Sequence, residues 1–332
     1  MIEESKIKAA AMALTRGQLV AFPTETVYGL GADASNQEAL EKLFRAKGRP
    51  THHPLIVHIG KEEELDKWCA EVPDAARLLA KLFWPGALTL VLKKAKSVSP
   101  LLTGGQDTIA IRMPSHPVAL KLLHEFGSGV AAPSANKFGR LSPTTADDVK
   151  AEFGDEIEIV LDGGQCEVGI ESTILDLTVA EPRILRPGMI QAETLFLALA
   201  EIGLSGNRPQ ADSEVPRVPG ALKSHYAPKT PMMLVSSSDL DQVLENFERE
   251  GKDAAVLSFK AAPMFHRNWI TVSKFAPHYA HMLYKHLHKL DSLGADLIVV
   301  EEPPAEPDWE GIADRLSRAA YLDAGEEKID GA

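Results

Sequence analysis

The stretch from Phe22 to Ile59, FPTETVYGLGADASNQEALEKLFRAKGRPTHHPLIVHI, predicts a helix between two short strands. Residues 19–22 (LVAF) and 55–59 (LIVHI) are apolar runs bounded by Pro and Gly, which is typical of buried strands. Residues 37–46 place apolar side chains on one helical face, after a Ser-Asn pair that offers an N-cap. The polar residues gather where the chain turns, so this stretch predicts an α/β fold with functional groups at its turns.

The end of this expected helix carries four cations, Lys42, Arg45, Lys47 and Arg49, with no acid among them. Cations are mildly favourable near a helix C-terminus, so a purely structural explanation exists. That explanation does not cover the break at Gly48–Pro50, which predicts that Lys47 and Arg49 project from a turn. In a chain of net charge −12, such a cluster indicates an anionic ligand.

Two interpretations of the stretch compete. GLGADA, residues 29–34, matches the G-x-G-x-x-A dinucleotide fingerprint between a strand and a helix. That fingerprint requires an acid about 20 residues later to hold a ribose hydroxyl, but this region is RPTHHPLIVHIG. The favoured alternative is a pocket on which three hydroxyls and two cations converge: Thr24, Thr26, Tyr28, Lys47 and Arg49.

Length and composition restrict the class of protein. At 332 residues the chain is long enough for two domains, and 45% hydrophobic and 25% charged residues are ordinary for a globular protein. We expect no signal peptide or membrane span, because no apolar run approaches about 20 residues. The two cysteines, Cys69 and Cys166, lie far apart, which fits a cytoplasmic protein and excludes a cysteine-based zinc site. The acidic net charge argues against extensive binding of nucleic acid.

Residues 1–202 predict one α/β domain. Its further expected helices are 3–15, 62–67, 74–83, 116–126 (HPVALKLLHEF) and one that begins within 142–149. Its later expected strands are 86–92, 108–114, 129–136 (a strand running into a polar turn), 156–161, 172–178 and 182–186. Because neighbouring strands are joined both by short turns and by helices, we expect a mixed twisted sheet with helices packed on it.

Residues 203–230 are rich in Pro, Gly and Ser without apolar periodicity, which predicts a linker. Residues 231–332 predict a smaller α/β domain with a mostly parallel sheet, since strands and helices alternate there. The expected strands are MMLV, AAVLSF and ADLIVV, and the expected helices lie near 238–249 and 276–292.

Several polar residues occur where the expected strands end. Arg112 follows Ile109 and Ile111 on a strand suited to burial, so its charge must be paired or face a cleft, where its fork suits a carboxylate. Ser134 and Asn136 follow an apolar strand at a position where open α/β sheets bind ligands, although both residues are also common turn formers. Each signal is weak by itself.

Taken together, these motifs resemble the threonylcarbamoyl-AMP synthases (L-threonylcarbamoyladenylate synthases). The motifs, in the family's order, are PTETVYGL, KGRP, PLIVH, IAIRMP, APSAN, SPTTADDV, GIESTI and ILRPG, over residues 17–190. PGALKSHYAP, residues 219–228, resembles the linker of the long form, which has a YrdC-like N-terminal domain and a smaller C-terminal α/β domain of Rossmann-like type. Residues 232–332 are similar mainly in layout.

The resemblance implies roles for individual residues. The threonine pocket would be lined by Thr26, His58, Arg112, Ala132 and Ser172. The nucleotide would contact Arg49, His53, Thr108, Ser134, Asn136, Ser142, Arg186 and Tyr226. Lys47 and Arg49 are the expected catalytic cations. His53 stands where the family often has Asn, which would make binding pH-sensitive.

The family's implied reaction joins ATP, L-threonine and bicarbonate into L-threonylcarbamoyl-AMP and pyrophosphate, for the N6-threonylcarbamoyladenosine modification at tRNA position 37. We expect Mg²⁺ to accompany ATP and no metal to be bound by the protein alone. The expected partners are the downstream tRNA threonylcarbamoyl-transfer machinery, with at most a transient contact to tRNA. The chain contains no Walker A motif, so a P-loop enzyme is excluded.

Three rival interpretations remain open. The concave basic pocket would grip RNA phosphates if the protein were a binding module without catalysis. A dinucleotide oxidoreductase would bind NAD(P)H without any dependence on threonine. The histidines at 278, 281, 286 and 288 offer pairs with metal-binding spacing, but a solvated helix face explains them more simply. Threonine-dependent release of pyrophosphate distinguishes the synthase from the binding module and from the oxidoreductase.

Overall fold

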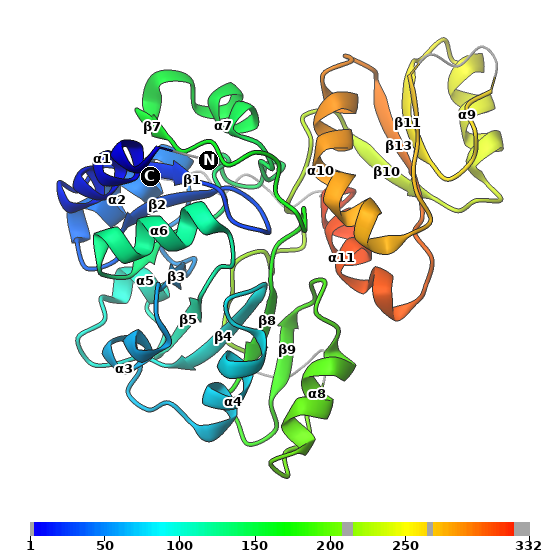
Figure 1. The fold of residues 1–332 in the computed structure, drawn as a ribbon. Helices are drawn as coiled ribbons and strands as arrows, with labels where there is room; N and C mark the ends of the chain where they lie inside the picture. The colour runs from blue at the N-terminus through cyan, green and yellow to red at the C-terminus, as the bar shows by residue number, and fades with distance from the viewer. Residues whose placement is uncertain (1–2, 208–214, 264–267, 322–332) are drawn as a thin grey trace.

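This computed structural model describes residues 3–207, 215–263 and 268–321. Figure 1 shows two units, a larger one coloured blue to green and a smaller one coloured yellow to red. Helices α10 (Ala276–Asp291) and α11 (Glu310–Ala319) of the smaller unit lie on the side that faces the larger unit. Helix α9 (Leu240–Arg249) lies on the far side of the smaller sheet.

The larger unit is built on a nine-stranded mixed sheet. Its spatial order is β7 (Ile159–Val160), β1 (Val20–Phe22), β2 (Gly29–Asp33), β6 (Val130–Ala131), β3 (Ile56–His58), β5 (Thr108–Arg112), β4 (Leu88–Lys93), β8 (Thr173–Asp176) and β9 (Arg183–Arg186). The β3–β5 and β4–β8 pairs are parallel, whereas β1–β2 and β4–β5 are antiparallel. The predicted mixed α/β sheet is therefore confirmed.

Helices cover this sheet. They are α1 (Glu4–Thr15), α2 (Gln37–Lys47), α3 (Leu65–Trp68), α4 (Asp74–Phe83), α5 (Pro100–Thr103), α6 (Pro117–Phe126), α7 (Ala146–Phe153) and α8 (Ala192–Ala200). Short 3₁₀ turns occur at Glu62–Glu64 and Gly154–Glu156. Helix α2 begins after Asn36, whose side chain accepts a hydrogen bond from the Ala39 amide, and it ends at Gly48 with φ 60°. The left-handed backbone at this end suits glycine, which carries no Cβ.

The strand expected over 129–136 is much shorter than its apolar run, because only Val130–Ala131 forms β6. The chain then turns, and the Tyr28 and Pro133 carbonyls accept backbone bonds from Ala135 and Leu30. The turn therefore stays attached to β2 without extending the ladder, and it leaves Ser134 beside the first strands.

The smaller unit has a fully parallel sheet in the order β10 (Met232–Val235), β13 (Leu297–Glu301), β11 (Ala254–Ser258) and β12 (Trp269–Thr271). A 3₁₀ turn at Pro307–Trp309 leads into α11. The parallel sheet was predicted, whereas β12 and α11 were not.

The two units share packed side chains. One cluster of buried residues joins Val27 and Ile170 of the larger unit to Leu283 and Leu316 of α10 and α11. Gly169 approaches α10 so closely that a Cβ there would lie 2.3 Å from the Ala280 carbonyl oxygen. No helix among the described residues is both long and apolar enough to cross a membrane.

Candidate functional site

A hollow of about 520 Å³, including its open mouth, lies in the larger unit beside the linker. Nine of the predicted site residues line it: Thr26, Arg49, His58, Arg112, Ala132, Ser134, Ser172, Arg186 and Tyr226. They come from the turn after β1, from the turn after α2, from β3 and β5, from the turn after β6, from the residue before β8, from the end of β9 and from the linker. The topology thus gathers motifs that are up to 200 residues apart into one cavity.

Arg112 occupies the end of β5 and is only 3% exposed. Its Nε donates to the Gly86 carbonyl at 3.1 Å, and its Nη1 donates to Thr26 Oγ1 at 2.8 Å. Its Nη2 lies 2.6 Å from Glu25 Oε1 but makes no directed hydrogen bond there. The charge is therefore paired with Glu25, and Arg112 also lines the cavity.

His58 lies directly across from Arg112 in the β3–β5 register. Burial and the neighbouring Arg112 cation lower the pKa of His58 to about 3, so the imidazole is neutral at pH 7. Its Nδ1 is buried without a hydrogen-bond partner. A neutral ring with an unpartnered nitrogen in the cavity wall offers a ligand one specific polar contact.

Thr24 shapes the adjoining turn. Its hydroxyl accepts from the amides of Thr26 and Val27, both at 3.2 Å, and donates to the Val27 carbonyl at 2.7 Å. These bonds hold the Thr26 hydroxyl 2.8 Å from Thr24 Oγ1 and against Arg112. The proposed convergence of hydroxyls holds for Thr24 and Thr26, which line the cavity side by side. Tyr28 also lines the cavity, but its hydroxyl donates to the Gly164 carbonyl and accepts from the Gly163 amide, both outside the cavity wall.

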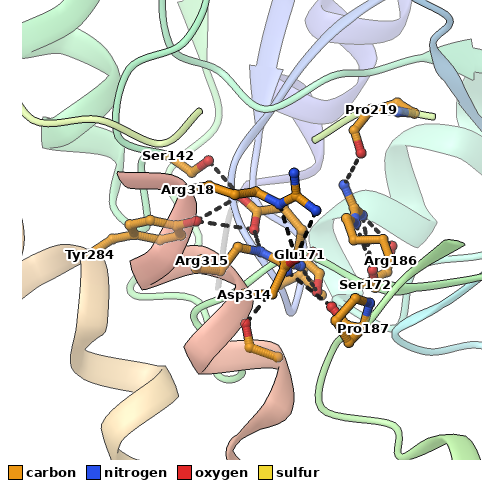
Figure 2. A network of polar contacts seen from close by, with 12 residues as sticks. Ser142, Glu171, Ser172, Arg186, Pro187, Pro219, Tyr284, Asp314, Arg315 and Arg318 are labelled. Atoms are coloured by element: carbon orange, nitrogen blue, oxygen red, sulfur yellow. Dashed lines mark hydrogen bonds and ion pairs between the residues drawn. The ribbon is translucent and has the colours of Figure 1, made fainter. Parts of the chain in front are cut away.

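Arg186 stands at the end of β9, fully inside the protein. Its Nε and Nη2 donate to the Ser172 carbonyl at 3.1 and 2.9 Å, and its Nη1 donates to the Pro219 carbonyl at 2.9 Å, as Figure 2 shows. Burial lowers the pKa of Arg186, yet an arginine remains charged at neutral pH. This residue therefore brings a fixed positive charge to the cavity and fastens Ser172 and the linker to it.

Arg49 supplies the second cation of this wall. Its Nη2 donates to the Pro54 carbonyl at 2.9 Å, while its buried Nε has no partner. Burial lowers the pKa of Arg49 to about 10, so the side chain is still charged at pH 7. An unsatisfied donor on a buried cation, facing a cavity, is suited to an anionic ligand.

Lys47 departs from the prediction. It is the last residue of α2, not a residue of the following turn, and it is 2% exposed. Its ammonium donates to the Ser134 carbonyl at 2.5 Å and to the Asn136 carbonyl. Gly48 caps the helix after Lys47, so the side chain reaches back into the protein and fastens the turn that carries Ser134.

Four other predicted contacts lie outside the cavity wall. Ser142 donates to Glu171 Oε1 at 2.6 Å, and the Asn136 amide donates to the Lys137 and Arg140 carbonyls. Thr108 begins β5 opposite Lys93, at the end away from Arg112. The ring centroid of His53 lies 5.1 Å from that of Phe138.

His53 is half-buried, and this changes the expected pH sensitivity. Burial and the Arg49 cation lower the pKa of His53 to about 4. The ring is therefore neutral at physiological pH, like the Asn that the family often has at this position. The prediction that His53 makes binding pH-sensitive is not supported above about pH 5.

Tyr226 closes one side of the cavity and is 1% exposed. It adopts φ 60°, which is uncommon for a residue with a bulky side chain. Its hydroxyl has no hydrogen-bond partner and packs against Gly220, where a Cβ would lie 2.0 Å from it. The surrounding contacts keep Tyr226 in this strained conformation, and the missing side chain of Gly220 leaves room for the ring over the site.

The cavity wall also contains residues that were not predicted as site residues from the sequence, among them Glu171, Gly220 and His225. Burial lowers the pKa of His225 to about 3, so it too is neutral at pH 7. Glu171 belongs to the GIEST motif and His225 to the HYAP motif, and a charged or aromatic residue within a motif was the sequence signal that could have identified them.

The family model described as "Telomere recombination" matches residues 12–188, and "Threonylcarbamoyl-AMP synthase, C-terminal domain" matches residues 189–321. The threonylcarbamoyl-AMP synthase of Pyrococcus abyssi (strain GE5 / Orsay) is 40% identical over 96% of this chain and 95% of that protein. The enzyme of that name from Bacillus subtilis (strain 168) is 38% identical, covering 96% and 93%.

The crystal structure of P. abyssi Sua5 complexed with L-threonine superposes on this chain with a TM-score of 0.89. It is 38% identical and covers 96% of this chain and 95% of its own. Sequence, family models and fold agree over nearly the full length. The chain belongs to the threonylcarbamoyl-AMP synthase family, in the long form with a C-terminal domain.

Proposed function

We propose that this protein is an L-threonylcarbamoyladenylate synthase that converts ATP, L-threonine and bicarbonate into L-threonylcarbamoyl-AMP and pyrophosphate. The observation that carries the proposal is the convergence of Arg49, Arg112 and Arg186 on one cavity between the sheet and the linker. A carboxylate, a triphosphate and a carbamate are all anions, so their shared site needs several fixed cations.

In this proposal the threonine carboxylate binds Arg112. The place of the Arg112 guanidinium in the cavity wall supports that assignment, as does the similarity to P. abyssi Sua5, which has been crystallised with L-threonine. Thr26 and the neutral His58 would bind the polar atoms of the amino acid. Glu25 keeps Arg112 oriented through its ion pair.

The chemistry proceeds in two bond-forming steps. The free amine of threonine attacks CO₂ derived from bicarbonate and loses a proton, which forms an N-carboxylate (carbamate). A carbamate oxygen then attacks the α-phosphorus of ATP, and the bond to the β-phosphate oxygen breaks to release pyrophosphate. Arg49 and Arg186 oppose the phosphate charge, so the protein contributes alignment and electrostatics without a covalent intermediate.

We propose that Mg²⁺ enters with ATP and is held by its phosphates. Glu171, which lines the cavity, and Glu25, which lies beside it against Arg112, are each engaged by an arginine, so neither is a ready metal ligand. Among the described residues no group of three or more His, Cys, Asp or Glu side chains is arranged to bind a metal. When bound, the ion neutralises phosphate charge.

The reaction places the protein among the nucleotidyltransferases, because an adenylyl group is transferred to a carbamate oxygen. The mixed anhydride is hydrolysable, so a threonylcarbamoyl-transferring machinery must consume it, and tRNA contact here would be transient. We place the reaction in the cytoplasm, in agreement with Cys69 and Cys166, which are both buried as free thiols.

The test is pyrophosphate release measured with all three substrates and with each one omitted. Release that requires threonine and bicarbonate supports the synthase. If no pyrophosphate is released and the protein binds RNA tightly in a salt-dependent manner, the synthase proposal is wrong and the protein is an RNA-binding module. Chelation of Mg²⁺ by EDTA should abolish release, and excess Mg²⁺ should restore it.

A further inference from the structure

Glu171 is a carboxylate buried in the cavity wall, where it is 6% exposed. Figure 2 shows that three side chains donate to it. Ser142 Oγ lies 2.6 Å from Oε1, the Tyr284 hydroxyl lies 3.1 Å from Oε2, and Arg315 Nε lies 2.6 Å from Oε2. Tyr284 and Arg315 belong to α10 and α11, so the C-terminal domain satisfies a carboxylate of the N-terminal cavity.

Arg315 itself is 1% exposed and has a defined set of acceptors. Its Nη2 donates to the Glu171 carbonyl at 3.2 Å, and its Nη1 donates to the Pro187 carbonyl at 3.0 Å. Its guanidinium carbon lies 5.3 Å from the centroid of the Tyr226 ring. One side chain thus contacts the residue before Ser172, the residue after Arg186 and the tyrosine that covers the cavity.

The backbone leaves α11 little freedom to move. Gly311, one turn before Arg315, packs on Gly188, and a Cβ at position 311 would lie 2.9 Å from Gly188 backbone atoms. Because this contact joins two backbone segments, it cannot relax by a change of side-chain rotamer. The position of the Arg315 guanidinium is consequently set by the docking of the two domains.

The charge on Glu171 matters for the nucleotide. Burial alone would raise its pKa, but Arg315, Arg186 and the Ser142 hydroxyl outweigh burial and hold the pKa below its usual value. Glu171 is therefore ionised at neutral pH. An uncompensated anion in this wall would repel the phosphates of ATP and reduce the effect of the Arg186 charge.

We propose that Arg315 is a positioning residue for the nucleotide pocket: by pairing with Glu171 it keeps that anion from offsetting the positive charges that Arg49 and Arg186 present to ATP phosphates. The pocket is then electrostatically complete only while the C-terminal domain is docked. This inference rests on the proposed function for the identity of the ligand as ATP.

The experiment compares Arg315→Met, Arg315→Met with Glu171→Gln, and Arg318→Met in the full chain. Arg315→Met should raise the KM for ATP and the Kd for an ATP analogue about tenfold, while the KM for threonine changes less than about threefold. Adding Glu171→Gln removes the unpaired anion and should restore ATP affinity to within about threefold of wild type. Arg318→Met deletes a cation of the same helix that pairs with Asp314 and donates to the Leu222 carbonyl but has no bond to Glu171, so ATP affinity should change less than about threefold.

Arg315→Met leaves the buried Glu171 charge without its arginine, so this variant is expected to unfold more readily. The double variant carries no such charge, and its ATP affinity therefore decides the proposal. A double variant that binds ATP more than tenfold weaker than wild type overturns the proposal, as does normal affinity in folded Arg315→Met. Calorimetry with the ATP analogue needs no turnover. If wild type binds ATP but releases no pyrophosphate, the proposed function fails while the role of Arg315 is still measured.

Discussion

Arg112 and Glu25 form an ion pair of 2.6 Å within the cavity wall, where their side chains are only 4% and 5% exposed. The second oxygen of Glu25 accepts the Ser115 amide at 3.0 Å, so the carboxylate is fixed from two sides. The pair holds a bidentate cation at the end of β5 before any substrate arrives. Such a preformed site reduces the ordering that binding requires.

Arg112→Ala should weaken threonine binding far more than ATP binding. Removing one partner of a buried charge pair costs about 2–5 kcal/mol, and part of that cost is the Glu25 charge left behind. Adding Glu25→Gln should therefore recover thermal stability but not threonine affinity. Calorimetry with threonine is the measurement, and unchanged affinity in Arg112→Ala would remove this residue from the site.

Lys47→Ala should lower the stability of the protein, because the Ser134 and Asn136 carbonyls lose their buried donor. Leaving buried acceptors unsatisfied costs about 1–3 kcal/mol. Arg49→Ala, by contrast, should mainly lower pyrophosphate release, since this cation faces the cavity. Urea unfolding and turnover of both variants separate the two roles. Equal stability of Lys47→Ala and wild type would contradict the anchoring role.

The folded protein should lose stability as the pH falls from about 6.5 toward 4. His58 and His225 have folded-state pKa values of about 3, below their usual 6.5, so only the unfolded chain gains these protons in that range. Each such histidine contributes a slope of about 1.4 kcal/mol per pH unit. His58→Gln should reduce the slope of unfolding free energy against pH by about that amount. An unchanged slope would mean that His58 is already charged in the folded state.

Trypsin cleavage within residues 203–230 should slow when ATP and threonine are both present. Arg217 in this segment is exposed and bonds to Gly104 and Gln106, whereas Tyr226 is buried against the cavity. If the segment acts as a lid, closing over ligands should protect it and exclude water from the product. Cleavage at the same rate with and without ligands would identify a passive tether.

The sequence predicted best what is determined locally. Helix α2 follows from its apolar spacing, the capping Asn36 and Gly48, all of which lie within a dozen residues. The prediction that Lys47 lies in a turn was wrong. The helix continues through Lys47 and ends only at Gly48, which forms its left-handed C-cap. Periodicity cannot distinguish those two positions.

The contribution of the C-terminal domain was missed for a different reason. Ile312, Leu316 and Ala319 are buried at helical spacing, and Arg315 shares their face. This apolar stripe predicts α11, and a cation within it indicates a buried partner. The identity of that partner, Glu171, depends on how two domains dock, and no local pattern records it. The predicted boundaries at 202 and 231 stay predictions.

The most direct test of the central claim is the identity of the product. The protein is incubated with ATP, L-threonine and ¹³C-bicarbonate, and the mixture is analysed by mass spectrometry. We expect threonylcarbamoyl-AMP carrying one ¹³C atom, equimolar with pyrophosphate, and none when threonine is omitted or Arg112 is replaced by alanine. Pyrophosphate without a labelled adenylate, or a labelled product that forms equally well without Arg112, would contradict the account.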